Sequence, residues 1–334
     1  MIPCCFHPTK VVVIDDNSEF LRSLNQDLSK THASYQYFKN PQKALQYINE
    51  TYKPDPFPNR YIESLDEEQW EHRQLDVNII DTHHEIYRTE RFEEISTIIV
   101  DHSMPGMSGL QLCKQIKDSN IQKILLTGVA DEHIAIHAFN EGIIHHYIRK
   151  QDMDMSDQLN QAVENAQWRY FNKLSEVAIK AITTADRTLN PIVDPKYHDF
   201  FKKLMKRGKF IEAYLCESMG SYLFLTQEGA AHGLVVNNEV QLEDAADSGE
   251  AQNIESSLLQ ELRERKLMMW FHSSQGILEP KAKDWKNHVY PPHTLQGMQE
   301  TYYYIFGPDI FDIDHSRILP FGEYKSCNVF EVYV

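Results

Sequence analysis

The sequence predicts a doubly wound α/β domain with a parallel sheet of order 2-1-3-4-5, followed by an α+β domain with antiparallel strands. Two short, β-branched runs, Val11–Ile14 and Thr97–Val100, are typical of buried parallel strands. The first run ends at Asp15 and Asp16, and the second ends at Asp101. Strands 1 and 3 of such a sheet are neighbours, and their carboxyl ends flank a crevice. We therefore expect the three carboxylates to meet there.

The remaining elements of the first domain follow from apolar spacing and from helix-capping residues. A helix over Asn17–Lys30 carries its leucines on one face, and Asn40-Pro41 opens another helix that runs to about Asn49. The other expected elements are a strand at Tyr35–Phe38, a helix at Met107–Lys117, a strand at Ile124–Leu126, a helix at Asp131–Asn140 closed by Gly142, and a strand at Ile143–Ile148. Thr127 and Lys150 then follow the fourth and fifth strands.

A long stretch without proline or glycine, Ser156–Ile182, predicts an extended helix. Its first half is expected to pack on the sheet as the last helix of the first domain. Its second half exceeds that need, so we expect residues 176–190 to form a helical connector or a dimer seam. Ordinary core packing and a coiled coil both remain open for its apolar stripe.

An unusual segment, Thr51–Ile95, separates the second expected helix from the third strand, where about 2–6 residues are usual. It begins with a proline-rich stretch but retains many apolar residues, which argues against a disordered tract. Two interpretations remain open. The segment is either a packed excursion that covers an edge of the domain or a docking surface for a kinase or for the second domain.

The strand-end residues and the loop Asp101-His102-Ser103-Met104-Pro105-Gly106-Met107-Ser108-Gly109 resemble the receiver domain of bacterial two-component response regulators. The resemblance implies a flavodoxin-like receiver over residues 1–175, with residues 51–95 as an insertion. Two features depart from the family pattern. Gln151 follows Lys150 where the family usually has proline, so the loop is expected to be less rigid. His102 and Ser103 place small or neutral groups beside Asp101, which is expected to change the lifetime of the phosphate in a direction that the sequence does not give.

The resemblance also implies a chemistry. Asp101 would accept a phosphoryl group from a sensor histidine kinase or a phosphotransfer protein. Mg²⁺ prefers oxygen ligands and keeps several waters, so its expected ligands are Asp15, Asp16, Asp101 and the Ser103 carbonyl. Lys150 would pair with the phosphoryl oxygens, Thr127 would donate a hydrogen bond to them, and Tyr147 would act as an aromatic switch. Self-phosphotransfer and autodephosphorylation are then the only activities expected of this domain.

Composition narrows the classes of partner. The chain has 334 residues and a net charge of −16, which argues against broad nucleic-acid affinity. Its five cysteines show neither metal spacing nor a disulfide framework, as is usual in a reducing cytosol. No apolar stretch approaches the length of a membrane span. We therefore expect a cytoplasmic protein that does not bind membranes.

The second domain, residues 191–334, is expected to combine helices with antiparallel strands joined by glycine turns. Its expected helices are Tyr197–Arg207 and Ile254–Lys266, and its expected strands are Phe210–Cys216, Ser221–Thr226, Gly233–Val236 and Thr301–Phe306. We find no phosphate loop, nucleophile elbow or paired metal histidines in it.

The function of this second domain stays open among three hypotheses. The whole chain resembles the response regulators of Legionella-type quorum-sensing circuits, which join a receiver to an uncharacterised output domain. The first hypothesis is a phosphorylation-controlled homodimer or partner contact. The second is a gated output domain that binds a small ligand or nucleotide, or acts as an enzyme. The third, a DNA-binding transcription factor, is disfavoured by the acidic charge and by the missing helix-turn-helix.

Overall fold

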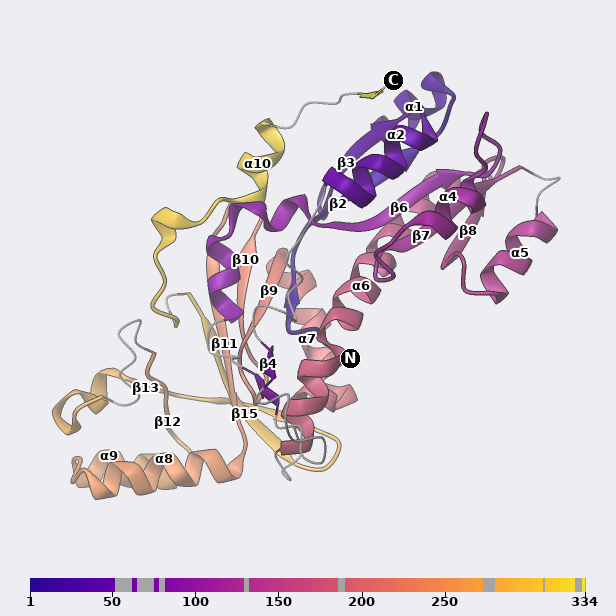
Figure 1. Cartoon of the computed structure of the whole chain (residues 1–334). Helices are drawn as coiled ribbons and strands as arrows, with labels where there is room; N and C mark the ends of the chain where they lie inside the picture. Colours follow the sequence, from indigo (N-terminus) through magenta and orange to yellow (C-terminus); the bar gives the residue numbers. More distant parts are fainter. Residues whose placement is uncertain are drawn as a thin grey trace. The chain divides into compact units, whose positions relative to one another are not determined.

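The computed structural model divides the chain into two compact units (Figure 1). It describes residues 1–51, 62–64, 75–77, 82–128, 132–185, 190–272, 280–308, 310–327 and 332–333. The parallel-sheet unit comprises Phe6–Arg60, Arg88–Glu176 and Leu319–Val334. The antiparallel-sheet unit comprises Met1–Cys5, Tyr61–Tyr87 and Val177–Ile318.

The parallel-sheet unit contains six strands in the order β16-β3-β2-β6-β7-β8. Every neighbouring pair in this sheet runs parallel. The strands are β2 (Thr9–Ile14), β3 (Ala33–Phe38), β6 (Ile95–Asp101), β7 (Gln122–Thr127), β8 (His146–Arg149) and β16 (Val332–Tyr333). Without β16, this order is 2-1-3-4-5, so the expected fold class is confirmed.

Helices cover both faces of this sheet because alternate strand residues point to opposite sides. Val11 and Val13 pack with α1 (Ser18–Asp27) and with the first half of α6 (Met155–Ala185). Val12 and Ile14 pack on the other face. The helices on that face are α2 (Pro41–Gln46), followed by a π-helical turn at Tyr47–Thr51, α4 (Gly109–Gln115) and α5 (Glu132–Asn140).

The fifth strand of the receiver-type sheet begins later than the sequence predicted. The expected strand started at Ile143, but β8 starts at His146. Gly142 ends α5 with a φ of +70°, and the backbone N–H of Ile143 donates to Ala138 O over 2.9 Å. Ile144 is then buried against the helices rather than paired in the sheet. The first residues of the apolar run 143–148 therefore close the end of α5, and only the later ones form a strand.

The end of the chain returns to the parallel-sheet unit, which local patterns did not predict. Helix α10 (Phe321–Cys327) buries Phe321 against Phe92, with ring centroids 5.0 Å apart. Phe92 lies in the 3₁₀ turn η3 (Thr89–Glu93). The hydroxyl of Tyr324 donates to Glu93 Oε1 over 2.5 Å, and β16 then pairs with β3. The division into units therefore departs from the expected domain boundaries, which assigned residues 319–334 to the second domain.

The antiparallel-sheet unit is built around a sheet of order β1-β9-β10-β11-β15-β14. Its strands are β1 (Cys5–Phe6), β9 (Phe210–Glu217), β10 (Ser221–Thr226), β11 (Ala231–Asn237), β14 (His293–Gln296) and β15 (Thr301–Gly307). Pairing is antiparallel from β9 through β14, as expected. Helix α7 (Pro195–Gly208) packs Phe201 against Tyr222 and Phe224 of β10.

A second helical layer in this unit contains one helix that the sequence analysis missed. Helix α8 (Glu239–Ala251) precedes α9 (Ser256–Arg263), and both pack around the buried Trp285. Arg263 bridges α9 to Asp247 and Glu250 of α8 over 2.6 and 2.8 Å. The smaller elements are η5 (Pro191–Val193), β12 (Met268–Met269), η6 (Ala282–Asn287), β13 (Val289–Tyr290) and η7 (His315–Arg317).

Much of the described insertion belongs to the antiparallel-sheet unit. Strands β4 (Ile62–Ser64) and β5 (Leu75–Val77) pair with each other, and both lie in the range of that unit. The 3₁₀ helix η2 (Thr82–Tyr87) is anchored there by Thr82 Oγ1, which donates to Leu215 O over 2.5 Å. The insertion thus contributes structure to the second unit, and both interpretations of its role stay predictions. Residues 52–61, 65–74 and 78–81 lie outside the described part.

The predicted long helix is present as α6, which continues from the parallel-sheet unit into the range of the antiparallel-sheet unit. It covers the expected connector as far as Ala185, and residues 186–189 lie outside the described part. Among the described helices, none has the length and apolar character needed to cross a membrane.

Candidate functional site

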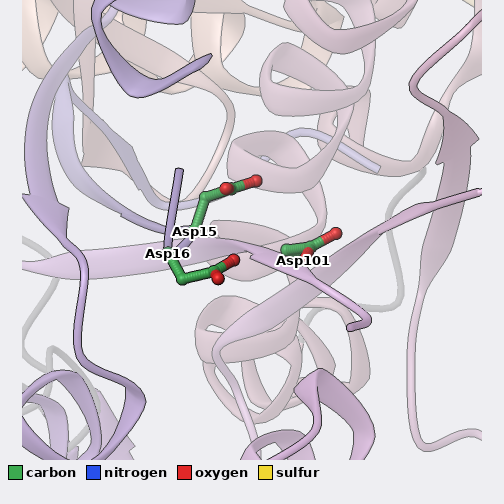
Figure 2. A group of neighbouring side chains, drawn as sticks. All are labelled: Asp15, Asp16 and Asp101. Carbon is green, nitrogen blue, oxygen red and sulfur yellow. The ribbon is translucent and has the colours of Figure 1, made fainter. Parts of the chain in front are cut away.

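Three carboxylates meet at the carboxyl edge of the parallel sheet, as the strand ends predicted. Asp15 directly follows β2, Asp16 comes next, and Asp101 is the last residue of β6. One carboxylate oxygen from each lies within 4.8 Å of the others, and Figure 2 shows the three side chains grouped together. Asp15 and Asp101 are buried, whereas Asp16 is exposed. Two carboxylates of the cluster are therefore shielded from solvent, and the third, that of Asp16, is accessible to it.

Lys150 joins two of these carboxylates. Its ammonium nitrogen lies 2.7 Å from Asp15 Oδ2 and 2.7 Å from Asp101 Oδ1. The backbone holds it there, because the N–H of Lys150 donates to Thr127 O over 3.0 Å. The ammonium also lies 4.5 Å from the centre of the Phe20 ring, a cation–π distance. The sequence-predicted lysine is thus in direct contact with the predicted phosphoacceptor.

The charges of this cluster are strongly coupled. Burial raises the pKa of Asp15, although hydrogen bonds from Lys150 and from the Asn17 backbone N–H act in the opposite direction. Burial lowers the pKa of Lys150, but its hydrogen bonds to Asp101 and Asp15 outweigh this, and the net pKa is raised. Lys150 therefore remains an ammonium at neutral pH and offsets part of the negative charge around Asp101.

Thr127 supplies a hydroxyl at the end of β7, the strand beside β6. Its side chain is fully buried, and within the described part of the chain Oγ1 has no hydrogen-bond partner. A buried polar group without a partner costs about 1–3 kcal/mol relative to one that is hydrogen-bonded. Thr127 Oγ1 is therefore a hydroxyl without a described partner at the same edge of the sheet, and its binding to a phosphoryl oxygen stays a prediction.

The loop after Asp101 connects β6 to α4. Ser103 is exposed in this loop, two residues after Asp101, and the position of its carbonyl relative to a metal stays a prediction. Ser108 caps α4 with a reciprocal pair of hydrogen bonds to Gln111. Gly109 then passes so close to the Asp101 backbone that a β-carbon would collide with the Asp101 carbonyl. Helix α4 is thereby held against the strand end that carries Asp101.

Tyr147 lies on β8, where it pairs with Leu125 of β7. Its side chain is half-buried and packs against the hydrophobic core on the α4–α5 face of the sheet. This is the strand on which an aromatic switch was expected. Its rotation on phosphorylation stays a prediction.

Three residues at the site were not singled out from the sequence. The ring of Phe20 makes the cation–π contact with Lys150, and the backbone N–H of Asn17 donates a hydrogen bond to the Asp15 carboxylate. Gly109 allows α4 to approach the backbone of Asp101 closely. Asn17 was detectable as an N-cap, and its side chain does cap α1. No local pattern indicated the other two, because their roles depend on contacts between distant segments.

The donor set fits a hard divalent cation. Carboxylate oxygens from three residues converge, and one of the three carboxylates is exposed. Among the residues that the structure describes, no histidine or cysteine belongs to the group. Such a set suits Mg²⁺, which is typically held by a few carboxylates and retains waters for further ligands. The site can therefore bring a cation, a nucleophilic carboxylate, an ammonium and a hydroxyl donor together around one small anion.

Comparisons with known proteins agree with this geometry. The response regulator receiver domain model matches residues 61–164 of the chain. The structure of the Legionella pneumophila response regulator LqsR is similar over 97% of this chain and 95% of that chain, with 31% sequence identity and a TM-score of 0.80. No curated protein matches the chain.

Two further structures are similar over about half of this chain. The adenylate cyclase from Rhodopirellula baltica covers 51% of this chain and 95% of its own, with 22% identity and a TM-score of 0.33. A response regulator receiver domain protein from Clostridium thermocellum covers 48% and 94%, with 22% identity and a TM-score of 0.31. The family assignment depends instead on the whole-chain similarity to the Legionella structure and on the receiver match. The chain therefore belongs to the two-component response regulators, and its parallel-sheet unit is the receiver domain.

Proposed function

We propose that this response regulator accepts a phosphoryl group on Asp101 from a phosphohistidine of a sensor histidine kinase or phosphotransfer protein. A carboxylate oxygen of Asp101 would form the new O–P bond while the N–P bond of the phosphohistidine breaks and its electron pair stays on the imidazole nitrogen. One observation carries the proposal: Lys150 contacts Asp101 at 2.7 Å inside a cluster that also contains Asp15 and Asp16. Phosphoryl transfer is catalysed mainly by such positioning and charge stabilisation.

We propose Asp15, Asp16, Asp101 and the Ser103 carbonyl as the residues that hold Mg²⁺ at this site. The exposure of Asp16 gives a cation access, and the mutual proximity of the three carboxylates supports binding. When bound, Mg²⁺ would neutralise charge on the phosphoryl oxygens.

The neighbouring residues have separate proposed roles. Lys150 would keep an ion pair with the phosphorylated Asp101, because it already contacts that side chain. Thr127 would donate its unpartnered hydroxyl to a phosphoryl oxygen. Movement of Thr127 toward the phosphate would leave space for Tyr147 to turn inward. Slow loss of the phosphate by hydrolysis would then reset the receiver.

Labelling with acetyl phosphate and Mg²⁺ tests this function. Wild-type protein should incorporate one hydroxylamine-labile phosphate, whereas Asp101→Asn should incorporate none. Asp154→Asn is the matched control, since Asp154 is exposed and lies outside the acidic cluster. Retention of full labelling in Asp101→Asn, with the fold verified by circular dichroism, would show that another residue is the acceptor.

We further propose that phosphorylation is relayed through dimerisation or partner contact of the output domain. Helix α6 supports this route, because a single helix of 31 residues runs from the receiver into the range of the antiparallel-sheet unit. Its residue Val177 is 47% exposed, which leaves an apolar side chain available for contact. Beryllofluoride, which mimics the phosphoryl group, should increase the dimer fraction measured by light scattering. Equal masses with and without it, across several concentrations, would contradict the relay.

A phosphohistidine donor also implies a cytoplasmic protein, and the whole-chain similarity supports a place in quorum-sensing signalling.

A nucleotide- or ligand-binding output domain is the alternative to the dimer relay. A thermal-shift screen of nucleotides on the full chain separates the two, because ligands that bind only the folded form raise its stability.

A further inference from the structure

The first turn of α1 contacts the charged groups of the acidic cluster at two points. The backbone N–H of Asn17 donates to Asp15 Oδ1 over 2.9 Å, and the ring centre of Phe20 lies 4.5 Å from the ammonium of Lys150. The same ammonium lies 2.7 Å from the other oxygen of that carboxylate, Asp15 Oδ2. One helical turn therefore contacts both a buried carboxylate and the cation that is paired with it, and a shift of this turn would move both.

The N-cap of α1 fixes the place of Phe20 in this turn. Asn17 Oδ1 accepts hydrogen bonds from the backbone N–H groups of Glu19 and Phe20, over 2.9 and 3.2 Å. Such a cap stabilises a helix because the first N–H groups have no partner within the helix itself. The Phe20 side chain is half-buried and packs against the hydrophobic core on the α6 face of the sheet. Its backbone and its side chain are thus both held in place.

The ring of Phe20 is the apolar neighbour of an ammonium that otherwise contacts carboxylates. An ammonium has three N–H donors, and two carboxylate oxygens, Asp15 Oδ2 and Asp101 Oδ1, each lie 2.7 Å from Lys150 Nζ. The Lys150 side chain is 24% exposed, so most of its surface is shielded from water. The face of an aromatic ring attracts a cation, and this attraction is stronger where water is excluded. The ring therefore replaces part of the hydration of the ammonium.

An aliphatic side chain at position 20 would exclude water without attracting the cation. The ammonium would lose part of its hydration and gain no interaction in return, so positions turned toward solvent would become more favourable. Lysine has a flexible four-carbon stem and a strongly hydrated ammonium, so such a movement costs little. Hydrophobicity alone therefore does not explain how this lysine is held, whereas an aromatic ring does.

The position of Lys150 matters most while negative charge moves from Asp101 onto phosphoryl oxygens. A positive group stabilises such a change best when it is already in place and does not have to shed water at that moment. Lys150 contacts Asp101 before any phosphoryl group arrives. A residue that keeps it there and partly dehydrated would accelerate the transfer.

We propose that Phe20 is a positioning residue, whose ring face holds the ammonium of Lys150 at Asp101 during phosphoryl transfer. This inference rests on the proposed phosphorylation of Asp101. Phe20 acts through the lysine and takes no part in forming or breaking bonds.

Initial rates of labelling by acetyl phosphate with Mg²⁺, measured on the full chain, test this role. In this reaction an Asp101 oxygen forms the new O–P bond, and acetate leaves with the electron pair of the O–P bond that breaks. Phe20→Leu should slow labelling about three- to tenfold, the range expected for a partly shielded cation–π contact. Phe20→Tyr keeps the ring and should label within about twofold of wild type. Urea unfolding verifies that both variants are folded.

Tyr35→Leu is the matched control, because Tyr35 is another half-buried aromatic residue that packs against the same hydrophobic core. This substitution also replaces an aromatic side chain with leucine, but it should leave the labelling rate unchanged. An effect of Phe20→Leu that exceeds that of Tyr35→Leu therefore separates the contact with Lys150 from a general loosening of the core.

The outcomes distinguish this role from the proposed function. If wild type and Phe20→Leu are labelled at the same rate, the positioning role is overturned while the proposed function stands. Slowing of Phe20→Tyr or Tyr35→Leu as large as that of Phe20→Leu would also overturn it, because packing rather than the ring would then control the rate. Absence of labelling in wild type would overturn the proposed function, and the role of Phe20 with it.

Discussion

The ammonium of Lys150 lies 2.7 Å from Oδ1 of Asp101, although Lys150 follows β8 and Asp101 ends β6, with β7 between these two strands. Their contact across β7 results from the shared direction of the strands, which brings all carboxyl ends to one edge. The same ammonium reaches Asp15 on the far side of Asp101. A single cation therefore holds together the two buried carboxylates of the cluster, and the effects of changing one residue at this site should extend to the others.

Magnesium should stabilise the folded receiver through Asp16. At a Mg²⁺ concentration ten times the dissociation constant, binding only to the folded state adds about 1.4 kcal/mol to the free energy of unfolding. Urea unfolding with Mg²⁺ and with EDTA measures this difference. Asp16→Asn should lose most of it, whereas the control Asp154→Asn should retain it. An undiminished magnesium effect in Asp16→Asn would exclude this carboxylate as a ligand.

Gly109→Ala should disturb the proposed phosphoryl site through the backbone. The added β-carbon would collide with the Asp101 carbonyl and would lie 3.1 Å from Leu125 Cδ1, so α4 must shift away from β6. We expect a loss of about 1–3 kcal/mol in unfolding free energy, the usual cost of overpacking, together with slower labelling by acetyl phosphate. Gly307→Ala is the control, because among the described residues its β-carbon would meet only Ile310, at 3.7 Å. Unchanged stability in Gly109→Ala would show that α4 is not held tightly against Asp101.

Glu217 should make the stability of the antiparallel-sheet unit depend on pH. Burial raises the pKa of Glu217 from its usual 4.5 to about 7, while the Ser221 hydroxyl partly opposes this. The folded state therefore binds a proton more tightly than the unfolded state, and its stability falls as pH rises from 4.5 to about 7. Glu217→Gln should remove this fall and be more stable than wild type by roughly 1–2 kcal/mol at pH 8, allowing for partial solvent exposure.

Unfolding of wild type and Glu217→Gln by urea between pH 4 and pH 8 provides the measurement. The two curves should coincide near pH 4 and separate as pH rises. Glu228→Gln, at an exposed position in the β10–β11 turn, is the matched control. A stability difference between wild type and Glu217→Gln that stays constant with pH would contradict the role given to burial.

Phe321→Ala should destabilise the receiver although the residue lies far from it in sequence. Phe321 is 0% exposed and packs on Phe92, so its truncation should cost about 3–5 kcal/mol. Phe139→Ala, at a side chain that is 47% exposed, should cost much less. Hydrogen exchange of β3 and β6 before and after the substitution locates the effect. Unaltered exchange in these strands would show that α10 does not stabilise the receiver sheet.

The sequence allowed the convergence of the three aspartates and Lys150 to be predicted because these residues are local signals with a shared geometry. Asp15, Asp101, Thr127 and Lys150 each lie at the carboxyl end of a recognisable parallel strand, so the sheet order alone brings them to one edge. The pairing of β16 with β3 had no local signal in the sequence, because the two strands lie nearly three hundred residues apart along the chain.

Helix α8 was missed for a different reason. Its sequence is rich in acidic residues and contains Gly249, which weakens the periodic apolar pattern. A signal was nevertheless present, because Asn238 and Gln241 form a capping box at its start. Greater weight on capping residues, relative to apolar spacing, would have identified this helix.

The return of residues 319–334 to the receiver also has a consequence for biosynthesis. A ribosome releases the chain from its N-terminus at about 5–20 residues per second, and domains commonly fold in that order. Here the sixth strand of the receiver sheet and Phe321 emerge only after the whole antiparallel-sheet unit has been translated. The receiver of the nascent chain therefore stays incomplete for a time on the order of tens of seconds. During this time Phe92 and the edge of β3 are uncovered, and chaperones can bind them.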